Sequence, residues 1–304
     1  MTPDLLRIDE RHDRHVRDVQ NESAPPGGAP IMNTPSRKDH VVFNHVVSIG
    51  LLLFLLSTAS GQTSVSPSSG SPLLRIGIAG LHDQVKDHLI APLRWDGIGG
   101  GLWLSYMVPR PTLEHEIDLL LPVSFLSNRY DHKAYAFGAS LGYSRLWLMD
   151  PSVLGGNLYL GGQVRWSAHC QFYADWDDSH VYWLGVYGFS PSLKWSKGYE
   201  SKQKVSITME VPLLALVSRP PDYQYTDQPP LQRLGYYFEA LHHNLKMTSV
   251  NEYVSLGLKA DYSGQIGERT MLGATWLFKY TTCKFPQTLS MISNTLTINY
   301  VIIL

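Results

Sequence analysis

An alternation of apolar and polar residues with a period of two recurs along most of this chain. In the clearest run, 157–172 (NLYLGGQVRWSAHCQF), every second residue from Leu158 onward is apolar or small. Because successive side chains of a β-strand point to opposite faces, the run predicts a strand with one apolar and one polar face. Similar runs occur elsewhere in the chain. Together they predict ten strands, at 74–79, 102–108, 114–125, 134–144, 157–172, 180–195, 204–213, 254–262, 272–281 and 295–304.

The lengths and connections of these runs favour a membrane-spanning barrel. Most runs exceed the roughly 5–6 residues of an average strand in soluble proteins. They suit the roughly 9–11 residues that a tilted strand needs to cross a membrane. Outer-membrane barrels alternate short periplasmic turns with longer outer loops. The short connections here are 109–112, 150–156, 197–203 and 263–269, and the longer ones are 82–98, 126–132, 173–179, 218–250 and 283–293.

Composition and the placement of aromatic residues agree with this class. Charged residues make up 17 % of the chain, and the net charge of −1 gives no electrostatic attraction for nucleic acid. We expect an all-β fold, a closed antiparallel transmembrane β-barrel of about 10 strands with long extracellular loops and short periplasmic turns. The alternative is a soluble sandwich or a lipocalin-like barrel. Aromatic rings settle at membrane interfaces, and several stand near the ends of the apolar faces: Tyr106, Tyr143, Trp147, Trp195, Tyr262 and Tyr300.

The segment before the strands has the features of an export signal. Its apolar stretch, 46–56 (VVSIGLLLFLL), follows two basic residues and precedes STASG. It is shorter than the roughly 20 residues of a spanning helix, and the order of its parts is typical of a secretory signal peptide. We expect a cleaved leader and signal peptide over 1–61 with Met1 or Met32 as its start, a mature chain from Gln62, a polar linker over 62–72, and a barrel over 73–304.

The signal peptide, the alternating runs and the C-terminal strand TLTINYVIIL resemble those of bacterial outer-membrane β-barrel proteins. The leader ending before Gln62 and the phrase DHLIAPLRWDG at 87–97 are similar to uncharacterised barrels of Bacteroidota. The resemblance covers the mature chain but no motif in it fixes an activity. It implies the outer membrane of a Gram-negative bacterium, with membrane lipid and lipopolysaccharide as partners and other envelope proteins as further candidates. The chain ends on Leu304, where proteobacterial barrels commonly have Phe.

Charged residues recur on the polar faces, which a barrel would turn toward its lumen. A narrow barrel has room for side chains and some water, and an unpaired buried charge is costly. We therefore expect a salt-bridged plug, with a narrow polar conduit for ions or small solutes as the alternative. The predicted lumen network is Arg75, Glu114, Glu116, Asp118, Arg165, Lys204, Glu210, Lys259, Asp261 and Lys279, with Lys194 and His169 on the same faces.

Within this network, Arg165 should find its carboxylate partner on another strand. Its neighbours on its own face, Gln163 and Ser167, cannot neutralise it. The triplet at 114, 116 and 118 and Glu210 are the candidates. The triplet itself should meet Lys204 or Lys279.

The longer connections carry candidate extracellular residues. Segment 218–250 is rich in Tyr and Pro, which suits a binding surface, and 174–180 (ADWDDSH) carries three carboxylates and a His. Carboxylate oxygens bind Ca²⁺, but the spacing matches no EF-hand loop. We therefore expect a solvated acidic turn, with no metal site and no cofactor. The extracellular candidates are Asp175, Asp177, Asp178, His180, His242 and His243.

A hydrolase with its site at the rim is the remaining alternative. Omptin-type proteases use Asp and His residues at the outer rim of ten-stranded barrels, and barrel acyl hydrolases use Ser–His pairs. Acid–base chemistry needs such groups within hydrogen-bond reach. No omptin-like motif or Ser–His spacing is legible, so we predict no catalytic residue. The expected loops place at the rim His82, Asp83, Asp87, His88, Asp177, His180, Asp222, Asp227, His242 and His243.

Overall fold

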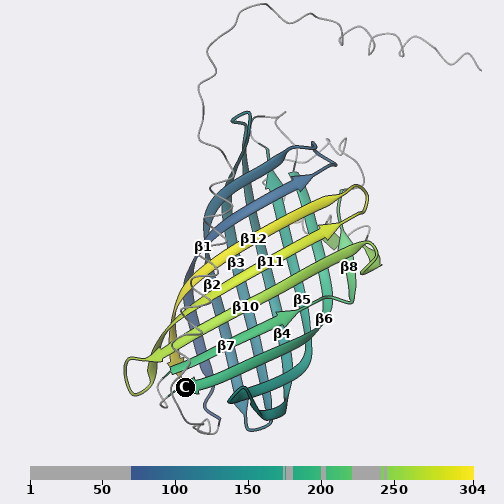
Figure 1. Cartoon of the computed structure of the whole chain (residues 1–304). Coiled ribbons are helices and arrows are strands. Elements are labelled where there is room, and N and C mark those ends of the chain that lie inside the picture. Colours follow the sequence, from purple (N-terminus) through teal and green to yellow (C-terminus); the bar gives the residue numbers. More distant parts are fainter. Residues whose placement is uncertain (1–69, 174, 176–180, 200–202, 221–240, 243–244) are drawn as a thin grey trace, which may run out of the picture. The chain divides into compact units, whose positions relative to one another are not determined.

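The strands of the computed structural model close into an antiparallel β-barrel (Figure 1). The structure describes residues 70–173, 175, 181–199, 203–220, 241–242 and 245–304, so the predicted leader and most of the predicted linker lie outside the described residues. The strands are β1 (Leu73–Asp87), β2 (Arg94–Arg110), β3 (Leu113–Asn128), β4 (Lys133–Val153), β5 (Gly156–Phe172), β6 (Val181–Tyr199), β7 (Gln203–Glu210), β8 (Leu214–Ser218), β9 (Lys246–Ser249), β10 (Tyr253–Gln265), β11 (Thr270–Cys283) and β12 (Leu289–Ile303).

β7 and β8 together occupy one strand position, and so do β9 and β10, so the twelve segments form the predicted ten-stranded barrel. β7 and β8 both pair with β6, and the residues between them continue that ladder through Val211 and Leu213. β9 pairs with β8 and β10 pairs with β7. Closure comes from β1, which pairs with β12 along its whole length, from Leu73 opposite Ile303 to Asp87 opposite Leu289.

Short turns lie at one end of the barrel and longer connections at the other, as predicted. The short-turn end holds 111–112, 154–155, 200–202 and 266–269, and the start of β1 and the end of β12 lie there as well. The turn at 154–155 is a tight hairpin in which Leu154 and Gly155 both have positive φ, 51° and 69°. At the long-loop end lie the strand ends that are joined through 88–93, 129–132, 173–180, 219–245 and 284–288.

Some connections are much shorter than the sequence predicts. The predicted loop 82–98 was wrong, because β1 continues to Asp87 and β2 begins at Arg94. The ladder between them runs unbroken from Leu73 opposite Met107 to Lys86 opposite Arg94. Polar residues occupy both faces of this part of β1, because Asp83 and Asp87 turn inward while His82, Gln84 and Lys86 lie on the outer face. The alternation is therefore lost although the strand continues. The predicted loop 283–293 shortens to 284–288 for the same reason.

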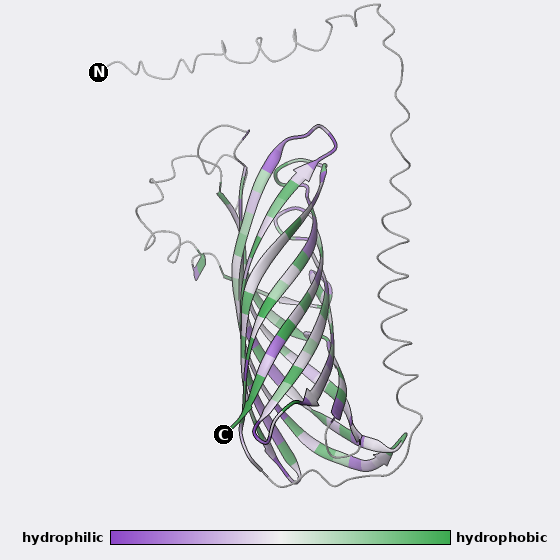
Figure 2. Cartoon of the chain, turned by 90° about the vertical axis from the view of Figure 1, so that its left-hand side faces the viewer, coloured by the Kyte–Doolittle hydropathy of each residue, from purple (hydrophilic) through white to green (hydrophobic). Residues whose placement is uncertain are grey.

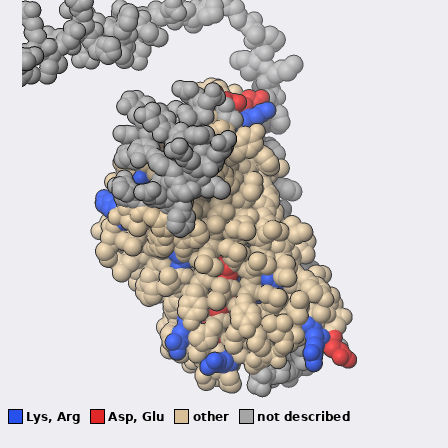
Figure 3. All heavy atoms as spheres, turned by 180° about the vertical axis from the view of Figure 1, so that it is seen from behind, with Lys and Arg blue, Asp and Glu red and all other residues tan. Residues whose placement is uncertain are grey.

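Hydrophobic and hydrophilic residues alternate along the strands (Figure 2), and the exposure of their side chains places them on the faces that the alternation predicts. On β5, Leu160 and Val164 are 45 % and 55 % exposed on the outer surface, while Gln163 is 6 % exposed and points inward. Apolar side chains cover the outside of the wall, with Ile78, Ile98 and Ile298 among the most exposed. The face seen in Figure 3 is mostly uncharged, with scattered Lys, Arg, Asp and Glu side chains.

Exposed aromatic residues stand near both ends of this apolar surface. Toward the short-turn end are Tyr106, Tyr143, Trp147 and Tyr300, four of the predicted set. Toward the long-loop end, Phe125 and Tyr135 are 60 % and 42 % exposed and their rings meet edge to face, with centroids 5.6 Å apart. Two aromatic girdles around an apolar band suit a membrane environment. Among the described residues, no helix is long and apolar enough to cross a membrane.

Candidate functional site in the barrel lumen

Ion pairs cross the lumen near the short-turn end. Glu114 of β3 accepts a 2.5 Å hydrogen bond from Lys194 of β6, and Lys204 Nζ of β7 lies 3.6 Å from the same carboxylate. The side chains of Glu114 and Lys194 are 4 % and 2 % exposed. A buried carboxylate needs such partners, because desolvation would otherwise destabilise its charged form.

A second group of ion pairs joins β1, β3, β10 and β11. Lys259 Nζ donates to Glu116 at 2.7 Å and lies 3.8 Å from Asp261. Asp261 also accepts from Thr275 Oγ1 at 2.7 Å and lies 3.5 Å from Arg75. Which strands face one another across a barrel depends on strand tilt and stagger, so these pairings follow from the closed structure.

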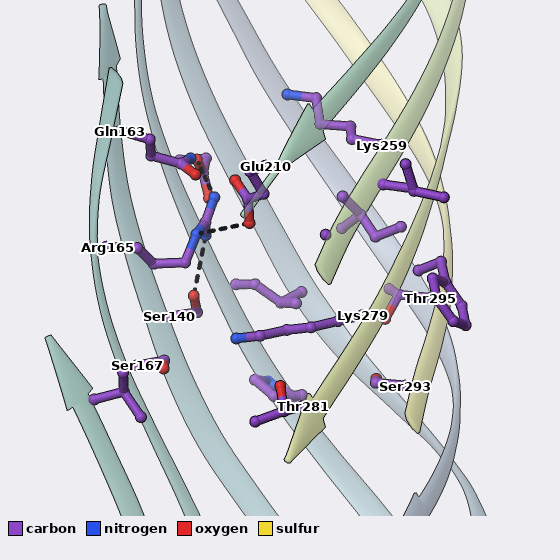
Figure 4. Close-up of a pocket in the computed structure, with 18 of the residues that line it drawn as sticks. Ser140, Gln163, Arg165, Ser167, Glu210, Lys259, Lys279, Thr281, Ser293 and Thr295 are labelled. Carbon is purple, nitrogen blue, oxygen red and sulfur yellow. Dashed lines mark hydrogen bonds and ion pairs between the residues drawn. The ribbon is translucent and has the colours of Figure 1, made fainter. Parts of the chain in front are cut away.

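Arg165 meets the two partners that the sequence made candidates. Its guanidinium donates to both oxygens of Asp118 at 2.8 and 3.1 Å and to Ser140 Oγ at 3.1 Å (Figure 4). Its Nε lies 3.7 Å from Glu210. Gly142 on β4 makes room for this pair, since a Cβ there would lie 2.7 Å from Asp118 Oδ1 and 2.9 Å from Arg165 Cζ.

We call these side chains the ion-pair layer. It consists of Arg75, Glu114, Glu116, Asp118, Arg165, Lys194, Lys204, Glu210, Lys259 and Asp261. The structure brings together nine of the ten residues of the predicted network and adds Lys194. Lys279 stands apart, because it makes no ion pair or hydrogen bond with a described residue. Of the two lysines predicted as partners of the 114–118 triplet, Lys204 lies 3.6 Å from Glu114, and Lys279 makes no ion pair with the triplet.

An apolar cluster, here the apolar cap, fills the lumen at the long-loop end. Trp95 and Tyr173 are almost fully buried, and their rings meet with centroids 4.9 Å apart. Burial raises the pKa of the Tyr173 phenol well above its usual range. The cap draws residues from nearly every strand: Val85, Leu89, Trp95, Leu126, Ala134, Ala136, Tyr173, Tyr182, Leu184, Val186, Ala215, Val217, Tyr253, Cys283 and Leu289.

A buried ion pair lies beside the cap. Arg219, which follows β8, donates to both oxygens of Asp87 at 2.7 Å. It also donates to the carbonyl oxygens of Phe285 and Gln287, at 2.8 and 2.6 Å. Arg219 thereby ties the end of β1 to the β11–β12 connection and to the chain after β8. The sequence gives no sign of this pair, because Asp87 falls within the predicted loop 82–98.

The rim candidates are thus corrected in part. Asp83 and Asp87 are inward residues of β1, 6 % and 5 % exposed. Asp83 accepts hydrogen bonds from Ser124 and Ser293. Its inward direction continues the alternation of β1, which the sequence analysis ended too early.

The described extracellular candidates do not converge on one site. Asp175 accepts a 2.6 Å hydrogen bond from the backbone N–H of Lys133. His242 contacts the Tyr187 hydroxyl through its Nε2. Among the described residues, no group of His, Cys, Asp or Glu could hold a metal ion. Outside the described residues lie Asp177, Asp178, His180, Asp222, Asp227 and His243.

A cavity of about 180 Å³ lies between the ion-pair layer and the apolar cap. Its apolar lining includes Leu146, Leu184 and Val186, and Arg165 and Lys279 are among its charged side chains. On β11, for example, Thr275 bonds to the ion-pair layer, Lys279 lines the cavity, and Cys283 belongs to the cap.

Comparison with known proteins shows only distant likeness. No family model matches the chain, and no curated protein is similar in sequence. The outer-membrane protease OmpT of Escherichia coli has 9 % identity and a TM-score of 0.40 over 80 % of this chain and 99 % of its own. The β domain of the Bordetella autotransporter BrkA has 13 % identity and a TM-score of 0.40 over 77 % and 99 %. Neisserial surface protein A has 12 % identity and a TM-score of 0.32, and the match covers 76 % of this chain and 97 % of its own. At these values the ten-stranded architecture rests on this chain's own strand pairing.

Proposed function

We propose that this protein is an integral outer-membrane β-barrel with a closed lumen, which acts through its long-loop end rather than as an open pore. The closed sheet supports the membrane assignment, because lipid offers no partner to an open strand edge. The apolar outer surface and its two aromatic girdles support it too. The leader supports export to the outer membrane of a Gram-negative bacterium, and the phrase at 87–97 supports a Bacteroidota-like origin.

The main support for a closed lumen is that side chains fill it at two levels. The ion-pair layer crosses the lumen near one end and the apolar cap crosses it near the other. A conducting pore needs a continuous polar path. An ion entering this lumen would have to displace paired charges and then cross buried aromatic and aliphatic side chains, from which it gains nothing in place of its hydration.

The outer role rests on the 219–245 connection. Its described residues 241–242 return along the outer face of β6, where Leu241 packs beside Cys170 and Trp183 and His242 contacts Tyr187. The connection is thus presented outside the wall rather than folded into the lumen at these points. Lipid and lipopolysaccharide would contact the apolar band, and other envelope proteins would meet the long-loop end.

The two alternatives receive less support. A rim hydrolase would need an Asp–His or Ser–His pair within hydrogen-bond reach. Among the described rim residues, Asp87 pairs with Arg219, Asp175 accepts from a backbone amide and His242 contacts a tyrosine, and neither the His82 nor the His88 imidazole hydrogen-bonds to an Asp or a Ser. A solute channel would need an open lumen.

Swelling of protein-containing liposomes in a small sugar tests the closed lumen. We expect vesicles with the wild-type barrel to swell no faster than protein-free vesicles, while a general porin supplies the positive control. Swelling at the porin's rate would favour the channel alternative.

A further inference from the structure

Lys279 differs from the other charged residues of the lumen cavity. Arg165 is paired with Asp118, Lys259 with Glu116, and Asp83 with two serines. Lys279 lines the same cavity and makes no hydrogen bond or ion pair with a described residue. Its neighbours across the sheet are Gly257 and Ser293, which offer no charge. The Lys279 side chain is half-buried, so its ammonium is open to the space of the cavity.

The ammonium of Lys279 points across the cavity toward the side of the lumen that holds Arg165 (Figure 4). Two cations therefore face the same space. The Arg165 guanidinium is committed to Asp118, Ser140 and Glu210, so its donors are used within the ion-pair layer. The donors of Lys279 remain available to a molecule inside the cavity.

Size and lining restrict that molecule. The cavity volume of about 180 Å³ exceeds the roughly 150 Å³ of an engineered protein cavity that holds benzene. A six-membered ring or a short aliphatic chain therefore fits. The aliphatic side chains of Leu146, Leu184 and Val186 suit an apolar body of this kind.

The charges around Lys279 restrict the polar group. Asp83, Asp118 and Glu210 also line the cavity and would repel a dianion such as phosphate. A single negative charge is repelled less than a dianion, and it can accept a hydrogen bond from the Lys279 ammonium, which makes no hydrogen bond or ion pair with a described residue. We propose that the lumen cavity is a binding site for a small monocarboxylate with an apolar body, whose carboxylate is held by Lys279.

Isothermal titration of the refolded barrel in detergent tests this site, with benzoate as the probe. Benzyl alcohol and benzylammonium serve as neutral and cationic analogues of similar size. We expect saturable binding of benzoate, weaker binding of benzyl alcohol, and none of benzylammonium. The Lys279→Met variant keeps the volume and removes the charge, so benzoate should bind at least tenfold more weakly while benzyl alcohol binds as before.

Two further variants keep the test independent of folding defects. Lys133→Met removes an exposed lysine at the start of β4 and should leave benzoate binding unchanged. Val186→Phe fills the cavity from β6 and should weaken binding of benzoate and benzyl alcohol alike. Heat-modifiable mobility in gels shows whether each variant is a folded barrel. Failure of the wild type to bind benzoate, or equal benzoate affinity in folded wild-type and Lys279→Met proteins, would overturn the site. Solute permeation tests lumen closure separately, so the two can fail independently.

Discussion

Removal of the Arg165 side chain should destabilise the barrel more than removal of an exposed arginine. In Arg165→Ala, Asp118 loses two hydrogen bonds of 2.8 and 3.1 Å and Glu210 loses a cation at 3.7 Å. Breaking a buried ion pair costs about 3–5 kcal/mol, chiefly because the remaining charge is left without a partner. The Arg165 and Asp118 side chains keep 21 % and 11 % exposure, so water offsets part of this cost. We therefore expect a loss near the lower end of that range, about 3 kcal/mol.

Equilibrium unfolding by guanidinium in detergent micelles measures this loss, followed by tryptophan fluorescence. Arg110→Ala is the matched control, because Arg110 is exposed at the end of β2, and surface substitutions usually stay within about 0.5 kcal/mol. The double variant Arg165→Met with Asp118→Leu removes both charges and should recover much of the stability. Equal stability of Arg165→Ala and Arg110→Ala would refute the idea that these pairs hold the lumen together.

Three other predictions concern the lipid face, the lumen and the orientation. Val164→Arg places a charge on the outer wall and should destabilise the inserted barrel by about 2–4 kcal/mol. Gln163→Arg places its charge in the lumen and should impair insertion into vesicles far less. Equal folding yields of the two variants would contradict the assigned faces. Lys259→Met leaves Glu116 without its nearest cation and takes a second cation from Asp261, so it should lower the unfolding temperature in detergent, and an unchanged temperature would argue that those pairs contribute nothing. Protease added to intact cells should cut within 218–250 and spare 109–112, whereas cleavage that requires disruption of the outer membrane would reverse the orientation.

The faces of the strands could be predicted from sequence because the outer surface of this barrel has one chemistry throughout. Leu160 and Val164 keep the period of two on β5, and that period alone fixes which residues point outward. The interior has no such uniformity. Residues 181–186 (VYWLGV) are apolar on both faces because their inner side chains belong to the cap, so alternation fades where the strand is most buried.

The ends of β1 and β2 were harder to predict for a different reason. Gly97 and Gly99 lie where the backbone of β3 comes close, and a Cβ on them would lie 1.9 and 2.1 Å from the carbonyl oxygens of Phe125 and Val123. Only glycine fits there, yet glycines next to Asp96 read as a loop in the sequence. These strands therefore extend further than their composition suggests.

The pairing of charges across the lumen lies beyond sequence reasoning as well. Alternation places Lys259 and Glu116 on inner faces but does not say that β10 and β3 bring them within 2.7 Å. That contact depends on the tilt and stagger of the closed barrel. Alternation does not distinguish Lys279 from the other lumen lysines, and only the structure shows that it makes no hydrogen bond or ion pair with a described residue.

The most direct test of the closed lumen is single-channel recording of the purified wild-type barrel in a planar lipid bilayer. With paired charges near one end and the apolar cap near the other, the account predicts a bilayer that contains inserted protein but shows no stepwise current at moderate voltage. Insertion is verified in the same preparation by protease protection of the strands. Stable, stepwise ion currents from the wild-type protein would contradict the account and identify the lumen as a channel.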